Sequence, residues 1–192
     1  MSPRLPARVA LGLALGALAG CASSPVQLAL TAPPAAARRP LPARAISVVF
    51  APTTDLRPEY QQSGVGHVGG RDVVAGQLLA WIDRSLQSLH GASFAVQSQN
   101  GAGAWHVTPL LRQFYTASVA VSKNANVVLE LQIQPPTGPA LTRVYRGRVN
   151  AVNWWNSAGE IEGTVVNALG DCLGRITRDL DALVQSPPAP AG

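Results

Sequence analysis

The stretch that decides the fold is residues 157–183, SAGEIEGTVVNALGDCLGRITRDLDAL. Ser157 followed three residues later by Glu160 forms a capping box, which marks the start of a helix. After it, apolar side chains recur every three or four residues, so a helix places them on one face. The members of this face are Ile161, Val165, Ala168, Leu169, Cys172, Leu173, Ile176, Leu180 and Leu183. The pattern predicts a long amphipathic helix that buries Cys172 as a small apolar side chain without a chemical role.

Ahead of this helix the apolar period shortens to two residues, which is typical of half-buried strands. Alternation predicts one strand with Val127, Leu129, Leu131 and Ile133 on its buried face. A longer segment, expected to bend at Pro109, places on one face Trp105, Val107, Leu111, Tyr115, Val119 and Val121. LTRVYRGRVNAVNW, from Leu141, predicts a further strand in which Gly147 marks a bulge. With a short strand at Phe94 and Val96, these segments are expected to form an antiparallel meander.

The N-terminal half of the expected domain begins with AISVVFA, residues 45–51, which reads as a buried strand. The Pro, Gly and Ser content of residues 52–70 predicts a loop. Asp72 is then expected to cap a helix that ends at Gly91. Its apolar face comprises Val74, Leu78, Trp81, Ile82, Leu86 and Leu89. The expected fold is α+β, an antiparallel sheet of four to five strands with two amphipathic helices packed on one face, in the order β-α-β-β-β-β-α.

The first twenty residues have the layout of an export signal. Arg4 and Arg8 precede an apolar run from about Val9 to Ala17, followed by small residues. This run is shorter than the roughly 20 residues that a membrane-spanning helix needs. The layout therefore predicts a leader that is removed after export.

Leu18-Ala19-Gly20-Cys21 resembles the lipobox of bacterial lipoproteins at all four positions. The resemblance implies that the Cys21 sulfur receives a diacylglycerol, that the preceding peptide is removed, and that the freed amino group is acylated, for example with palmitate. Two or more acyl chains hold a protein firmly on a membrane. The resemblance also implies the destination: in that family an Asp after the cysteine commonly implies retention in the inner membrane, so Ala22 at this position favours the periplasmic face of the outer membrane. The alternative to a lipobox is an ordinary signal peptide with an accidental cysteine behind it.

The resulting domain plan has four parts. Residues 1–20 are the signal peptide, 21–44 the acylated cysteine with a Pro/Ala-rich tether, 45–185 the globular α+β domain, and 186–192 a disordered tail. The 192-residue chain has 15 basic and 10 acidic residues, a formal charge of +5. Loss of Arg4 and Arg8 with the leader lowers this charge to +3. A mildly basic, exported protein is not expected to bind nucleic acid.

Motifs for catalysis and metal binding are weak. Gly64-Val65-Gly66-His67-Val68-Gly69 spells GxGxxG, but it lies far behind the preceding strand, so a dinucleotide site is not expected. His67, His90 and His106 have no metal-ligand spacing, and because the Cys21 sulfur carries the lipid, the one remaining thiol, Cys172, cannot form an intramolecular disulfide. We therefore expect no enzyme activity, no cofactor and no metal. An envelope hydrolase assembled from distant residues remains the alternative.

Two groups of residues are candidates for binding a partner, an envelope protein or a lipid. Arg146 and Arg148 share one face of their expected strand, near Arg143, and suit phosphate or carboxylate groups, or a solvated outer face of the sheet. In Trp154-Trp155 adjacent side chains point different ways. One indole is expected to pack under the last helix and the other to be an exposed anchor for a partner. The oligomeric state stays open.

Several segments resemble the YajG-type bacterial lipoproteins. These are ISVVF followed by Asp55-Leu56-Arg57, then LLAWIDRSLQSLHGASFAV, YRGRVNAVNW and the closing helix. The resemblance implies a small, non-enzymatic outer-membrane lipoprotein that binds or supports cell-envelope components. The order of elements is also similar to that of PqiC-type auxiliary lipoproteins of lipid-transport complexes, which is the alternative function.

Overall fold

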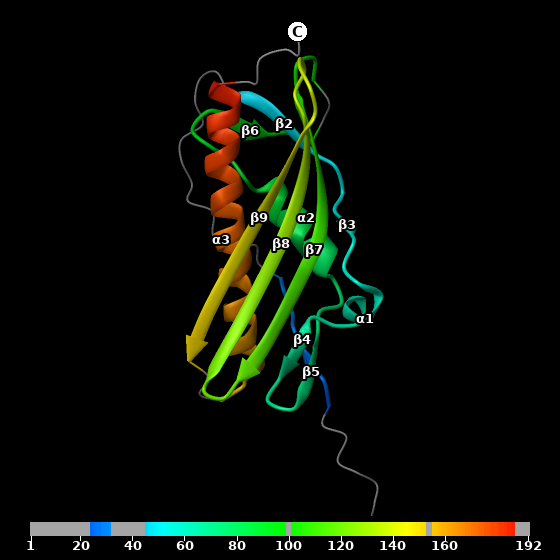
Figure 1. Cartoon of the computed structure of the whole chain (residues 1–192), viewed down its shortest axis with the longest axis vertical. Helices are drawn as coiled ribbons and strands as arrows, with labels where there is room; N and C mark the ends of the chain where they lie inside the picture. The colour runs from blue at the N-terminus through cyan, green and yellow to red at the C-terminus, as the bar shows by residue number, and fades with distance from the viewer. Residues whose placement is uncertain (1–23, 32–44, 99–100, 153–154, 187–192) are drawn as a thin grey trace, which may run out of the picture.

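The computed structural model describes residues 24–31, 45–98, 101–152 and 155–186. Three long strands run side by side along the molecule, and a long helix follows them (Figure 1). The strands are β7 (Trp105–Val119), β8 (Ser122–Gln134) and β9 (Leu141–Val152), and the helix is α3 (Ala158–Gln185). β7 pairs antiparallel with β8, and β8 with β9, so the predicted meander is confirmed for these strands.

The sheet as a whole is mixed and, within the described residues, has nine strands, which corrects the expectation of a purely antiparallel sheet of four to five strands with the order β-α-β-β-β-β-α. On the side away from β8, β7 pairs in parallel with three short strands, β2 (Ile46–Phe50), β3 (Thr54–Asp55) and β4 (Gly66–Val68). β6 (Phe94–Val96) adds to β2 in parallel. Parallel neighbours need a long crossover, and the crossover from β2 to β6 includes α2 (Leu78–Gln87). Alternating side chains indicate a strand but carry no information on its direction.

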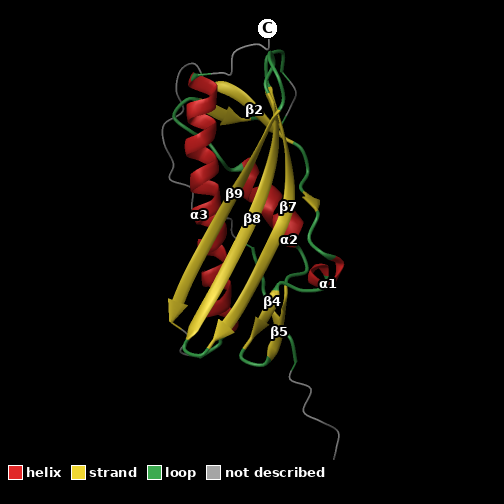
Figure 2. Ribbon diagram, viewed as in Figure 1, coloured by secondary structure: helices red, strands yellow, loops and turns green. Residues whose placement is uncertain are grey.

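Residues 52–70 are more structured than the predicted loop. They contain β3, the short helix α1 (Glu59–Gln62) and β4. Asp72, expected as a helix cap, lies instead in β5 (Arg71–Val74), which forms a hairpin with β4 (Figure 2). Gly69 and Gly70 have φ values of 58° and 76° and make its turn, a conformation that glycine adopts without strain. The β-branched pair at the end of β5 therefore belongs to a strand, and α2 begins at Leu78.

A β-bulge at Arg112 corrects the predicted face of β7. The pairing with β8 shifts between Leu111 and Gln113, whereas Pro109 lies in regular register. An extra residue reverses the alternation beyond it. Phe114 is therefore buried, and Tyr115 and Val119, which were expected on the inner face, are exposed.

Gly147 also differs from the expectation, because β9 pairs with β8 in continuous register and has no bulge there. The glycine instead lets α3 approach the sheet. A Cβ atom at Gly147 would lie 1.9 Å from the carbonyl oxygen of Ala168. The position therefore requires a residue without a side chain.

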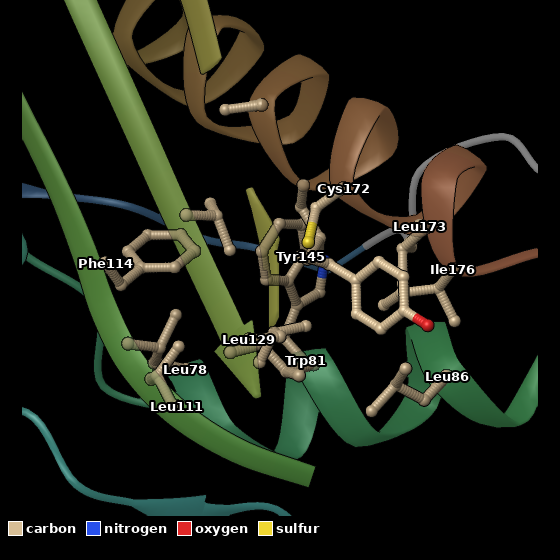
Figure 3. Packing of buried hydrophobic residues seen from close by; sticks show 14 of the residues in the cluster. Leu78, Trp81, Leu86, Leu111, Phe114, Leu129, Tyr145, Cys172, Leu173 and Ile176 are labelled. Carbon is tan, nitrogen blue, oxygen red and sulfur yellow. The ribbon is translucent and has the colours of Figure 1, made fainter. Parts of the chain in front are cut away.

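Both long helices pack on the same face of the sheet, as predicted. Leu111, Leu129 and Tyr145 are cross-strand neighbours, so they share this inner face. Trp81 of α2 meets Phe114 in an edge-to-face contact, with ring centroids 6.2 Å apart. In the close view, Cys172 of α3 and Trp81 of α2 lie with Tyr145 between the helices and the strands (Figure 3). Of the predicted helix face, every member is buried except Leu183, which is partly buried.

Part of the segment expected as a tether is packed into the body. β1 (Val26–Gln27) pairs in parallel with β5. Val26, Leu28 and Leu30 are buried in the core. Cys21 and residues 187–192 lie outside the described residues, as does the segment 32–44. Within the described part of the chain, no helix is both long enough and apolar enough to cross a membrane.

Candidate functional site

The sequence-predicted binding residues lie on two different surfaces. Tyr145 and Gly147 face the helices, so Arg146 and Arg148 point from the outer face of β9, where both are exposed. Trp155 is exposed just before α3 begins. Trp154 lies outside the described residues. The structure therefore brings the two arginines together and separates them from Trp155.

Arg146 also belongs to a hollow of about 610 Å³ between the edge of β9 and the C-terminal half of α3. We call it the arginine groove. It is lined by Arg143, Val144, Tyr145, Arg146, Arg175, Arg178, Asp179 and Ala182. The residues from α3 follow helical spacing, so they form one stripe toward the strand edge. Four arginines from one strand and one helix thus line one shallow depression.

The two acids near the groove are already engaged. The Tyr145 hydroxyl donates a hydrogen bond to the Asp179 carboxylate, and the Arg143 Nε lies 3.8 Å from the same oxygen. Burial, together with this bond, raises the pKa of Tyr145, so the phenol stays protonated and remains a donor. Asp171 pairs with Arg175 one helical turn away, at 3.2 Å.

Two arginines of the groove keep their charge available. Among the residues that the structure describes, Arg146 and Arg178 make no ion pair. A guanidinium is permanently charged, and its planar fork of donors matches phosphate and carboxylate groups. The groove is therefore suited to an anionic group. Sequence reasoning found Arg146 but missed Arg178, although the sequence Arg175-x-x-Arg178-Asp179 places all three side chains on one side of a helix.

A second hollow, of about 470 Å³, lies between α1, the β4–β5 hairpin and β7. Tyr60 and Tyr115 contribute exposed rings to it. Its wall is held by Arg57, a buried residue whose guanidinium donates to the carbonyl oxygens of Gln61 and Gly64 at 2.9 and 3.0 Å. The same side chain makes a two-pronged contact with Asp55, at 2.8 and 3.0 Å, and this hydrogen bond lowers the pKa of Asp55.

The glycines of the GxGxxG stretch have structural roles in this region. Gly66 has a φ of 135°, and a Cβ there would lie 1.8 Å from the carbonyl oxygen of Thr116 in β7. Gly69 makes the hairpin turn described above. Both positions thus demand glycine for strand geometry.

The histidines are dispersed. His67 contacts Asp72 at 3.1 Å, His90 lies near the Ser88 carbonyl, and His106 is exposed on β7. Across the described ranges, no three His, Cys, Asp or Glu side chains are grouped so that they could hold a metal ion.

No protein-family model matches the chain, and no curated protein sequence matches it. Among solved structures, an uncharacterized protein aligns over 73% of this chain and 95% of its own, with a TM-score of 0.50 and 13% identity. A Xanthomonas campestris protein assigned to the DUF330 family aligns over 84% of this chain and 92% of its own, with a TM-score of 0.48 and 12% identity. A Neisseria meningitidis lipoprotein aligns over 65% of this chain and 98% of its own, at a TM-score of 0.33 and 11% identity. At 13% identity, the similarity to the uncharacterized protein shows a shared fold and nothing about function.

Proposed function

We propose that this protein is a non-enzymatic bacterial lipoprotein of YajG-like type. It is anchored at the periplasmic face of the outer membrane through Cys21, and its arginine groove binds an anionic component of the cell envelope. The observation that carries the binding role is the pair Arg146 and Arg178, whose charges are unpaired within the described residues. They project from a strand and a helix that are locked together by packing. Such a frame holds the backbones of the two arginines at a fixed spacing, which favours recognition of phosphate or carboxylate groups by their side chains.

The chemistry of the groove supports binding rather than proton transfer. Arginine cannot give up its proton in the physiological range. Tyr145 has a raised pKa and donates to Asp179, which also faces Arg143. The groove residues thus hold charge and hydrogen bonds in place, while a catalytic base would need a free group that titrates near neutral pH.

The groove is tested by affinity purification of the acylated full-length protein from membranes in mild detergent, with mass spectrometry of proteins and lipids. With the double variant R146A/R178A, the amount of anionic partner that is recovered is expected to fall at least tenfold. R84A is the matched control, because Arg84 is an exposed arginine on α2, outside the groove. Equal recovery with R146A/R178A and with the unaltered protein would refute the binding role.

The same experiment separates the first proposal from its alternative. Recovery of inner-membrane transporter subunits that depends on Arg146 and Arg178 would make this protein an auxiliary subunit of a lipid-transport complex, as in PqiC-type lipoproteins. Recovery of an anionic envelope component without such subunits would favour the first proposal.

The anchor is tested separately by Cys21→Ser. This variant is expected to accumulate as a precursor that incorporates no labelled palmitate, because the thiol that receives the diacylglycerol is absent. Unchanged acyl labelling of the variant would refute the proposed anchor.

A further inference from the structure

One end of the molecule gathers segments that are far apart in the sequence. The described chain starts there, at Ser24, whose carbonyl oxygen accepts a hydrogen bond from Arg71 Nε at 2.9 Å. Two residues before Arg71, the Gly69 amide donates to the Ser118 hydroxyl at 2.9 Å, beside the β7–β8 turn. Figure 1 shows the first described residues, in blue, at the same end as the β4–β5 turn and the β7–β8 turn. We call this the anchor end.

Four apolar side chains project from the anchor end. Val119 is 62% exposed, Val121 74%, Val152 56% and Trp155 85%. They are neighbours, because Ser122 pairs with Val119 on one side and with Val152 on the other. Trp155 adjoins Asn156, which lies so close to Gly69 that a Cβ there would be 2.6 Å from its amide nitrogen. Together these four residues are the anchor-end patch.

The turn between β7 and β8 has an unusual composition for a hairpin in water. Its two loop residues are Ala120 and Val121, and Ala120 has a φ of 51°. Glycine, asparagine or aspartate normally occupies such a position, because they tolerate this backbone and are polar. The charged residue nearest the turn, Lys123, points inward instead, where its ammonium group contacts Glu160 at 2.7 Å. The tip is thus apolar.

We propose that the anchor-end patch lies in the interfacial layer of the same membrane that holds the acyl groups of Cys21. This inference rests on the proposed lipid anchor. Three peptide steps separate Cys21 from Ser24, so the anchor reaches at most about 11 Å from the body. A patch at that end is therefore held against the membrane surface. Tryptophan is enriched at membrane interfaces, and exposed valines lose contact with water when they enter it.

This placement orients the domain. α3 begins beside the patch at Ala158, and Arg178 lies 20 residues further along it. At 1.5 Å per residue, the arginine groove is then held about 30 Å from the membrane surface. The groove thus faces components of the periplasm and not the headgroups of the bilayer that carries the anchor.

The test uses the acylated full-length protein in phosphatidylcholine vesicles that contain brominated lipids. A W154F background removes the neighbouring indole, and Trp81 and Trp105 are buried, so changes in emission report Trp155. On reconstitution, emission is expected to shift to shorter wavelength and to be quenched by bromines near the top of the acyl chains. V119N/V121N should lower this quenching at least twofold, because two polar amides replace the apolar tip. L56N is the control, since exposed Leu56 follows β3, far along β7 from the turn.

The outcomes separate the inference from its premise. The mass of the N-terminal peptide reports acylation independently of fluorescence. An acylated protein whose Trp155 is not quenched overturns the membrane contact and leaves the anchor intact, as does an equal effect of L56N and V119N/V121N. Protection of Trp155 in native membranes but not in lipid vesicles also overturns it and assigns the patch to a protein partner. A peptide without acyl groups overturns both the anchor and the inference.

Discussion

Gly147 of β9 and Ala168 of α3 touch so closely that a Cβ atom on the glycine would lie 1.9 Å from the alanine carbonyl oxygen. The same Cβ would lie 2.7 Å from the backbone nitrogen of Cys172. Both atoms belong to the backbone of the helix, so they cannot move without moving α3. The strand and the helix that form the arginine groove are therefore positioned by this contact.

Gly147→Ala is expected to destabilise the protein by about 2–3 kcal/mol or more, as overpacking against backbone does. Urea denaturation measures the change. Gly163→Ala is the control, because Gly163 lies in the same helix with no atom within 4 Å of an added Cβ. Gly163→Ala is expected to stabilise the protein by up to about 1 kcal/mol, because alanine favours an open helical position over glycine. A loss below about 0.5 kcal/mol for Gly147→Ala would contradict the close approach.

How far the sequence predicts this structure depends on how local each signal is. The face of α3 and the alternation of β8 follow from hydrophobic periodicity, because each element is half buried along its whole length. The reversal at Arg112 is not visible in the sequence, because Phe114 and Tyr115 are both aromatic and either alternation would place an apolar ring on the inner face. A glycine at position 147 of a strand indicates that a side chain is not tolerated there. Whether a bulge or a closely packed helix is the reason depends on residues far away in the sequence.

The candidate site was less predictable than the fold. Arg146 is conspicuous among the strand residues, but its neighbour Arg178 is 32 positions later, and the approach of α3 to β9 alone brings them together. The apolar β7–β8 tip had a local signal, namely valines around a position where a turn residue was due. In the sequence, Val119 and Val121 continue the alternation that begins at Trp105, so the pattern assigns them to the long strand and not to a turn.

Asp55 and Arg57 provide a pH-dependent contribution to stability. The hydrogen bond from the Arg57 side chain lowers the pKa of Asp55 in the folded state. A carboxylate with a lowered pKa stabilises the fold at pH values above its unfolded pKa, about 4, and this contribution is lost as the pH falls through the folded pKa. Asp55→Asn is expected to cost about 2–3 kcal/mol at pH 7, because it leaves buried Arg57 without its countercharge.

The measurement is urea denaturation of the protein and of Asp55→Asn between pH 7 and pH 3. The difference between the two should shrink toward acid pH, as Asp55 becomes protonated in the unaltered protein. Asp72→Asn serves as the control, because Asp72 is highly exposed and its contact with His67 is at the surface. A difference that is constant with pH would mean that the ion pair does not stabilise the fold.

Lys123 and Glu160 join the start of β8 to the first turn of α3. The Lys123 side chain is 1% exposed, and its ammonium group lies 2.7 Å from the Glu160 carboxylate. Glu160→Gln leaves a buried ammonium without a countercharge, whereas Lys123→Met removes the charge and keeps the shape of the side chain. The urea midpoint should therefore fall further in Glu160→Gln than in Lys123→Met. Equal losses would show that the lysine reaches water when its partner is removed.

Cys172 reports whether α3 stays seated on the sheet. Its thiol is fully buried, and burial raises its pKa to about 12. Because the thiolate is the reactive form, labelling at pH 8 requires both exposure and deprotonation. In a Cys21→Ser chain, which leaves one thiol in the sequence, the reaction with a maleimide should be at least about a thousandfold slower under native conditions than in urea, since it waits for unfolding.

Gly147→Ala should speed native labelling, because its Cβ pushes against the backbone nitrogen of Cys172, while Gly163→Ala should not. Rapid native labelling without either substitution would mean that α3 leaves the sheet readily, and the groove would then lack the rigid frame on which its proposed function depends.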